Sequence, residues 1–127
     1  MAEALLLSNE GKYEESLKAI SGISLKETLV FSKGCGALLN LFFTTSFCYF
    51  MMGENNKSIK LCETIVAFFQ KYRKYFSKSI HEKDMVRVHE KNVALLCINH
   101  IFLEEKPKPS TMDIFKNTSI KYKEKHT

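Results

Sequence analysis

Hydrophobic residues recur with helical spacing through the second half of the chain. Between Gly53 and Ser77 they follow one another at steps of three or four positions, which places them on one face of a helix. This pattern predicts a helix over residues 55–76. A further helix is predicted over residues 82–104, and its segment 93–98 is apolar nearly all round, as expected of a helix buried between neighbours. The apolar stripe of the first helix comprises Ile59, Cys62, Val66, Phe69, Tyr72 and Phe76.

Shorter helices are predicted in the first half of the chain. Residues 2–8 form an apolar helical segment, and residues 13–20 carry apolar side chains at helical spacing after a turn at Gly11. Ser24 and Glu27 have the spacing of a capping box, which suggests a helix over residues 24–32. Another helix is predicted over residues 37–52. The sequence leaves open whether these last two are one element or two.

The chain after residue 105 differs from the part before it. Pro107 and Pro109 interrupt the helical pattern, and a short helix is predicted to begin at Ser110. We therefore divide the chain into a helical-hairpin domain, residues 1–105, and a segment with a Pro-containing linker, a short helix and a basic tail, residues 106–127. With only 5 Gly and 2 Pro in 127 residues, the sequence favours an all-α fold over a turn-rich β fold.

Residues 34–52 carry no charge, which opens a second interpretation of this segment. Nineteen uncharged residues are almost enough to cross a bilayer as a helix. Asn40, Thr44 and Thr45 dilute the hydrophobicity, however, and an amide is costly to place in lipid. We favour a buried helix of a helical protein, with a membrane anchor as the alternative.

Charge is distributed unevenly along the chain. Residues 1–32 hold three lysines and five glutamates, a net charge of −2, so the other 16 basic and 9 acidic residues give residues 33–127 a net charge of +7. A basic surface favours acidic partners, whether an acidic protein segment, a nucleic acid or an anionic membrane.

Two segments of the chain align at an offset of 42 residues. Gly11-x-x-Glu14-x-Ser16-Leu17-Lys18 matches Gly53-x-x-Asn56-x-Ser58-Ile59-Lys60. Each follows an apolar helix and precedes an amphipathic one, so the same hairpin is predicted twice.

The first of these segments resembles the middle of a tetratricopeptide repeat. Gly11, Tyr13 and Ser16 stand where that family has its turn glycine, its inter-helix tyrosine and a small residue. Gly53 and Ser58 match again, while Asn55 replaces the tyrosine, and the offset of 42 exceeds the usual repeat of about 34 residues. The resemblance implies antiparallel helical hairpins stacked as a short array, with a surface that binds a protein or peptide and no catalytic role.

The sequence offers little for catalysis or for binding a cofactor. Its cysteines, at positions 35, 48, 62 and 97, lie in apolar runs, and we expect reduced, buried thiols. Cys97 and His100 could share a metal ion, but no second pair has ligand spacing. His89 is predicted to be an exposed helix residue. We expect no enzyme activity, no cofactor and no metal site.

Basic residues gather between positions 71 and 91 among aromatic ones. Such a strip can bind RNA, although Arg73 and Arg87 are the only arginines of the chain. We predict a non-catalytic protein-interaction module in a larger complex, with self-association, nucleic-acid binding and a membrane anchor as alternatives. The expected location is the cytoplasm, or else the nucleus. Candidate partner-binding residues are Asn55, Lys60, Lys71, Lys74, Lys78 and Arg87.

Overall fold

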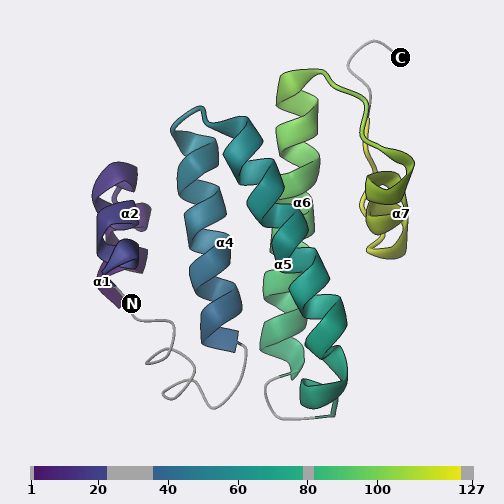
Figure 1. The fold of residues 1–127 in the computed structure, drawn as a ribbon, viewed down its shortest axis with the longest axis horizontal. Helices are drawn as coiled ribbons and strands as arrows, with labels where there is room; N and C mark the ends of the chain where they lie inside the picture. The colour runs from purple at the N-terminus through teal and green to yellow at the C-terminus, as the bar shows by residue number, and fades with distance from the viewer. Residues whose placement is uncertain (1, 23–35, 79–81, 124–127) are drawn as a thin grey trace.

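The computed structural model describes residues 2–22, 36–78 and 82–123, and every regular element in these ranges is an α-helix (Figure 1). The predicted helix over residues 24–32 lies outside them. The all-α prediction is confirmed, and each of the two longest helices begins and ends within one residue of the predicted bounds. The helices are α1 (Ala2–Asn9), α2 (Tyr13–Ser21), α4 (Gly36–Met51), α5 (Asn55–Phe76), α6 (Glu82–Leu103) and α7 (Pro109–Asn117).

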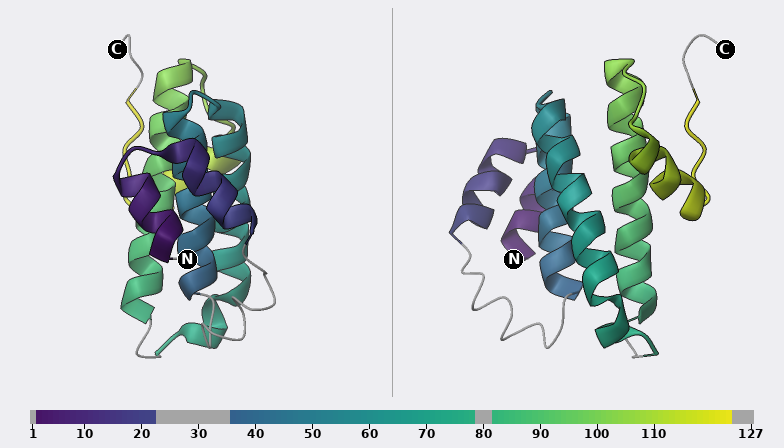
Figure 2. Two further views of the ribbon diagram at one scale, coloured as in Figure 1. Left: turned by 90° about the vertical axis from the view of Figure 1, so that its left-hand side faces the viewer. Right: turned by 45° about the vertical axis from the view of Figure 1, so that its right-hand side comes forward.

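Successive helices pack against each other around a central α4. The chain rises through α4, descends through α5 and rises again through α6, while α1 and α2 form a shorter hairpin beside α4 (Figure 1). An end-on view places α2 and α5 toward one side of α4, and α1 and α6 toward the other (Figure 2). Both α2 and α5 contact α4, whereas no Cα atom of α2 lies within 8 Å of a Cα atom of α5.

The same backbone motif ends α1 and α4. Gly11 has φ +80° and Gly53 has φ +81°, the left-handed conformation that favours glycine. At each end two hydrogen bonds return to the last helical turn: from the Gly11 N–H to the Ser8 carbonyl at 3.1 Å and from the Lys12 N–H to the Leu7 carbonyl at 2.9 Å in the first case. After α4, the Gly53 N–H likewise donates to the Phe50 carbonyl at 3.1 Å, and the Glu54 N–H donates to the Tyr49 carbonyl at 2.9 Å. These Schellman motifs explain why both turns need glycine.

A hydrogen bond between the two helices of each hairpin is also repeated. The Ser16 hydroxyl donates to the Ala4 carbonyl at 2.7 Å, and the Ser58 hydroxyl donates to the Ser46 carbonyl at 2.8 Å. Donors and acceptors are both 42 residues apart, the offset found in the sequence. Each serine is fully buried, so a larger side chain at either position would force the hairpin apart. Residues 2–9 and 13–21 therefore pair as residues 44–51 and 55–63 do.

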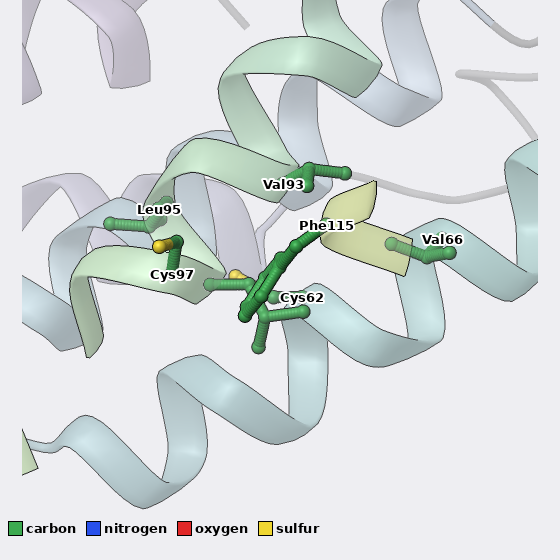
Figure 3. Packing of buried hydrophobic residues seen from close by; sticks show 7 residues of the cluster. Cys62, Val66, Val93, Leu95, Cys97 and Phe115 are labelled. Carbon is green, nitrogen blue, oxygen red and sulfur yellow. The ribbon is translucent and has the colours of Figure 1, made fainter. Parts of the chain in front are cut away.

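The main core cluster joins the last three helices. Phe115 of α7 is only 1% exposed and belongs to one buried cluster with Val66 of α5 and Val93 of α6 (Figure 3). The Tyr122 ring stacks on Phe115 with the ring centres 6.4 Å apart, and its hydroxyl donates to the Glu105 carbonyl at 3.2 Å. The short helix after the proline linker thus shares the hydrophobic core of α5 and α6. The boundary placed at residue 105 stays a prediction.

Buried asparagines fix the position of α6 along α5. Asn92 and Asn99 lie seven residues apart on one face of α6 and are fully buried. The Asn92 amide donates to the Cys62 carbonyl at 3.0 Å, and the Asn99 amide donates to the Ser58 hydroxyl at 2.9 Å. A slide of one helix along the other would break both bonds and bury unpaired amides. Hydrophobic contacts alone would not specify the register so closely.

The uncharged segment is central in the fold. Leu39 and Cys48 of α4 are fully buried, and the Thr44 and Thr45 hydroxyls donate to backbone carbonyls four residues earlier, at 2.9 Å each. Among the helices that the structure describes, none has both the length and the hydrophobicity needed to span a bilayer.

Candidate interaction surface

A groove of about 520 Å³ runs over α4 between α2 and α5. Its floor is largely apolar, because Leu41, Phe42 and Tyr49 line it, and Ile20 at the end of α2 forms one wall. The α5 wall adds Leu61 and Thr64. The Phe42 ring packs edge-on against Phe68 with the ring centres 6.4 Å apart, which holds the floor in place. Of the residues that the structure describes, Lys57 and Lys60 are the charged ones in the groove lining.

A row of exposed residues follows the solvent side of α5 beside this groove. Its members succeed one another at steps of three or four positions, so they lie on one face of the helix. None of them is acidic. We call this the lysine row, and it comprises Lys57, Lys60, Thr64, Ala67, Lys71 and Lys74.

Three of the six candidate contact residues predicted from the sequence belong to the lysine row. Among the described residues, no carboxylate lies within 4.0 Å of the ammonium group of Lys60 or Lys71. Lys57, in contrast, pairs with Glu54 at 3.1 Å. The Lys71 ammonium lies 5.4 Å from the centre of the Tyr72 ring. Lys60 and Lys71 therefore offer positive charge beside the apolar groove that no described carboxylate neutralises.

The other three candidate residues lie elsewhere. Asn55 is turned inward, where its amide donates to the Asn99 side chain at 3.1 Å. Lys78 follows α5 with φ 65°, and its backbone N–H donates to the Glu82 carboxylate at 2.9 Å. Arg87 is exposed on α6 among Glu82, Lys83 and Glu90, where the charges are mixed. Asn55 and Arg87 therefore lie outside the lysine row, and Lys78 lies beyond the C-terminal end of α5.

The structure gives little support for base stacking by the basic strip. The Tyr72 ring is half-buried and packs on Phe68 with the ring centres 4.6 Å apart. The Arg73 guanidinium lies 5.6 Å from the centre of the buried Phe69 ring. Both groups are therefore engaged with rings of α5 itself, and the strip divides into lysines on α5 and mixed charges on α6.

His89 is half-buried, so the prediction that it is exposed was wrong. Its ring stacks on Phe69 with the ring centres 4.0 Å apart and an angle of 7° between the planes. The Nδ1 atom is buried and has no hydrogen-bond partner among the described residues. Desolvation, and to a lesser extent the Arg73 charge, lower the pKa of His89 below 6.5.

We expect the protein to lose stability as the pH falls below about 6.5, because protonated His89 is favoured in the unfolded chain. The stabilisation is complete above that pH and is lost progressively toward the lower pKa of the folded state. Thermal unfolding midpoints at pH 7.5 and 5.5 test this, and His89→Phe, which keeps a ring against Phe69, should reduce the difference. An equal drop in the variant would assign the pH dependence to other groups, including His100, whose pKa desolvation also lowers.

The described cysteines are packing residues. Cys48, Cys62 and Cys97 are buried free thiols, as predicted, while Cys35 lies outside the described residues. Burial raises the pKa of Cys62 from 9.0 to about 12, which leaves almost no thiolate near neutral pH. No group of three metal-ligating side chains occurs within the described ranges, and so Cys97 and His100 remain a single pair.

Sequence patterns did not reveal the exposed apolar side chains of α6. Phe102 is 69% exposed and Ile98 is 41% exposed. The edge of the Phe102 ring contacts Phe50 of α4, with the ring centres 5.2 Å apart. The exposed position of Ile98 could not be predicted, because residues 93–98 are apolar nearly all round and their pattern does not show which face of the helix is exposed to solvent.

Comparison with known proteins places the whole described fold in one family. No curated protein and no solved structure matches the chain. One family model, described as RNA polymerase I-associated factor PAF67, matches residues 5–127. This match covers α1 from residue 5 onward and the five other described helices, including the groove and the lysine row. The chain therefore belongs to the RNA polymerase I-associated factor PAF67 family.

Proposed function

We propose that this chain is a non-catalytic interaction module that holds a partner protein within a larger complex associated with RNA polymerase I. The observation that carries the proposal is the apolar groove over α4 with the lysine row beside it. Apolar surface provides affinity and charges at its border provide selectivity, a combination typical of protein-binding surfaces. The description of the family as a polymerase-associated factor supports the same role.

The family description also favours the nucleus over the cytoplasm, since RNA polymerase I is named in it. The cytoplasmic location expected from the sequence gains no support from the comparisons. We therefore propose a nuclear protein, in agreement with the alternative that the sequence left open.

We further propose that the α1–α2 and α4–α5 hairpins are a lengthened form of the tetratricopeptide repeat. Their support is the repeated glycine motif together with the repeated serine hydrogen bond, each at an offset of 42 residues. In such an array a hairpin buries its apolar face only against its neighbours, and the exposed faces serve for binding.

Isolation of the tagged chain from nuclear extract tests the proposed function. After nuclease treatment and washing at physiological salt, RNA polymerase I subunits should co-purify in stoichiometric amounts by quantitative mass spectrometry. Recovery that nuclease abolishes would indicate a nucleic-acid bridge instead. Recovery of the tagged chain without polymerase subunits would contradict the proposal.

A further inference from the structure

We propose that the groove between α2 and α5 binds an acidic amphipathic helix of a partner protein, which deepens the proposed function and rests on it. The apolar face of that helix would enter the groove, and its carboxylates would pair with the lysine row. Three features of the described residues support this occupant.

Length is the first feature, because the lysine row is much longer than a small-molecule ligand. Lys57 and Lys74 are 17 residues apart on one helix, which corresponds to about 26 Å along the axis. A helix of about five turns has the same length. An elongated ligand can therefore contact the apolar floor and the lysines at both ends, whereas a small ligand can contact only one end.

Charge is the second feature. Among the described residues, the lining of the groove carries Lys57 and Lys60 and no acidic residue, and Lys71 continues the row. Lys60 and Lys71 have no carboxylate within 4.0 Å among the described residues, so a partner can supply one. Residues 23–35 of the chain itself hold two lysines and one glutamate, and they would not neutralise the row.

The chemistry of the floor is the third feature, and it favours a protein over a nucleic acid. Ile20, Leu41 and Leu61 in the lining are aliphatic. Its two rings already have partners within the chain, since Phe42 packs edge-on against Phe68 and the Lys57 ammonium lies 5.6 Å from the centre of the Tyr49 ring, so neither is a free platform for a base. The one guanidinium of α5, that of Arg73, lies against Phe69 and away from the groove lining. Aliphatic side chains suit instead the leucine-type face of an amphipathic helix in a groove.

Fluorescence anisotropy of a labelled synthetic peptide provides the test. The probe is a 20-residue helix-forming peptide with leucines on one face and glutamates on the other, titrated with the full chain. The double variant Lys60→Glu/Lys71→Glu should weaken binding about tenfold or more. Its matched control, Lys83→Glu/Lys91→Glu, makes the same change of charge at exposed positions of α6 and should change the dissociation constant less than about twofold.

A second variant tests the groove without changing charge. Thr45 is half-buried in the groove lining, so Thr45→Tyr should occupy part of the space and weaken the probe about tenfold. Circular dichroism must show an unchanged helical content for each variant. If that content falls, Thr64→Tyr on the exposed wall of the groove replaces it, with the same expected loss of binding.

Three results would overturn the inference. The first is that a peptide with the same composition in scrambled order binds as tightly as the probe, since binding would then depend on charge alone and not on an apolar helix face. The second is tighter binding of a single-stranded RNA of equal charge at physiological salt, and the third is unchanged affinity in the groove variants. Each leaves the polymerase co-purification result standing, so failure of this inference is distinguishable from failure of the proposed function.

Discussion

Replacing Phe115 with alanine should lower the free energy of unfolding by about 3–5 kcal/mol, the range typical of a buried phenylalanine. The ring from α7 is part of the buried cluster to which Val66 of α5 and Val93 of α6 also belong (Figure 3). The other buried side chain of α7 is Thr111. The packing of α7 against α5 and α6 therefore depends mainly on the Phe115 ring. Urea denaturation followed by circular dichroism measures the change.

Phe102→Ala is the matched control for that experiment. The same side chain is removed from a position that is 69% exposed, so the expected cost is less than about 1 kcal/mol. Similar losses for the two variants, or a loss below about 1 kcal/mol for Phe115→Ala, would show that α7 is not part of the core. The ratio of the two losses in free energy of unfolding therefore tests whether residues 109–117 fold together with α5 and α6.

Replacing Asn99 with leucine should cost about 1–3 kcal/mol although the two side chains have similar volumes. The Asn99 amide donates to the Ser58 hydroxyl at 2.9 Å and to the Leu95 carbonyl at 3.1 Å, and its oxygen accepts from Asn55 at 3.1 Å. Leucine removes all three hydrogen bonds at a fully buried position. Urea denaturation again gives the change in free energy.

A double-mutant cycle of Asn99→Leu with Ser58→Ala should reveal coupling of about 0.5 kcal/mol or more, because the two side chains contact each other. Asn56→Leu is the control, because Asn56 is exposed in the same turn of α5 as Ser58. This variant should change the free energy of unfolding by less than about 0.5 kcal/mol. Additive losses in the cycle would indicate that the asparagine does not act through Ser58.

The helices could be predicted from the sequence because each signal is local. The period of the apolar stripe gave α5 its bounds, and Gly53 marked the turn before it because only glycine readily adopts φ near +81°. Ser16 and Ser58 were recognised as small residues at repeat positions. Their hydrogen bonds across the hairpin were not, since the acceptors are backbone carbonyls twelve residues earlier.

Contacts between helices could not be predicted in the same way. Asn92 and Asn99 flank the apolar segment 93–98, and nothing in the sequence indicates which group of α5 each amide meets. His89 looked exposed because its stacking partner, Phe69, is twenty residues away on another helix. The lysines at 60, 71 and 74 were identified by charge, but the groove beside them is formed by α2, α4 and α5 together.

Lysine footprinting on the isolated polymerase-associated complex tests the central claim most directly. Amine-reactive labelling, read by mass spectrometry, compares each lysine in the free chain and in the complex. Our account predicts that Lys60 and Lys71, exposed in the free chain, become protected, while Lys83 and Lys91 on α6 keep their reactivity. Protection of Lys83 and Lys91 with Lys60 and Lys71 still reactive would contradict it.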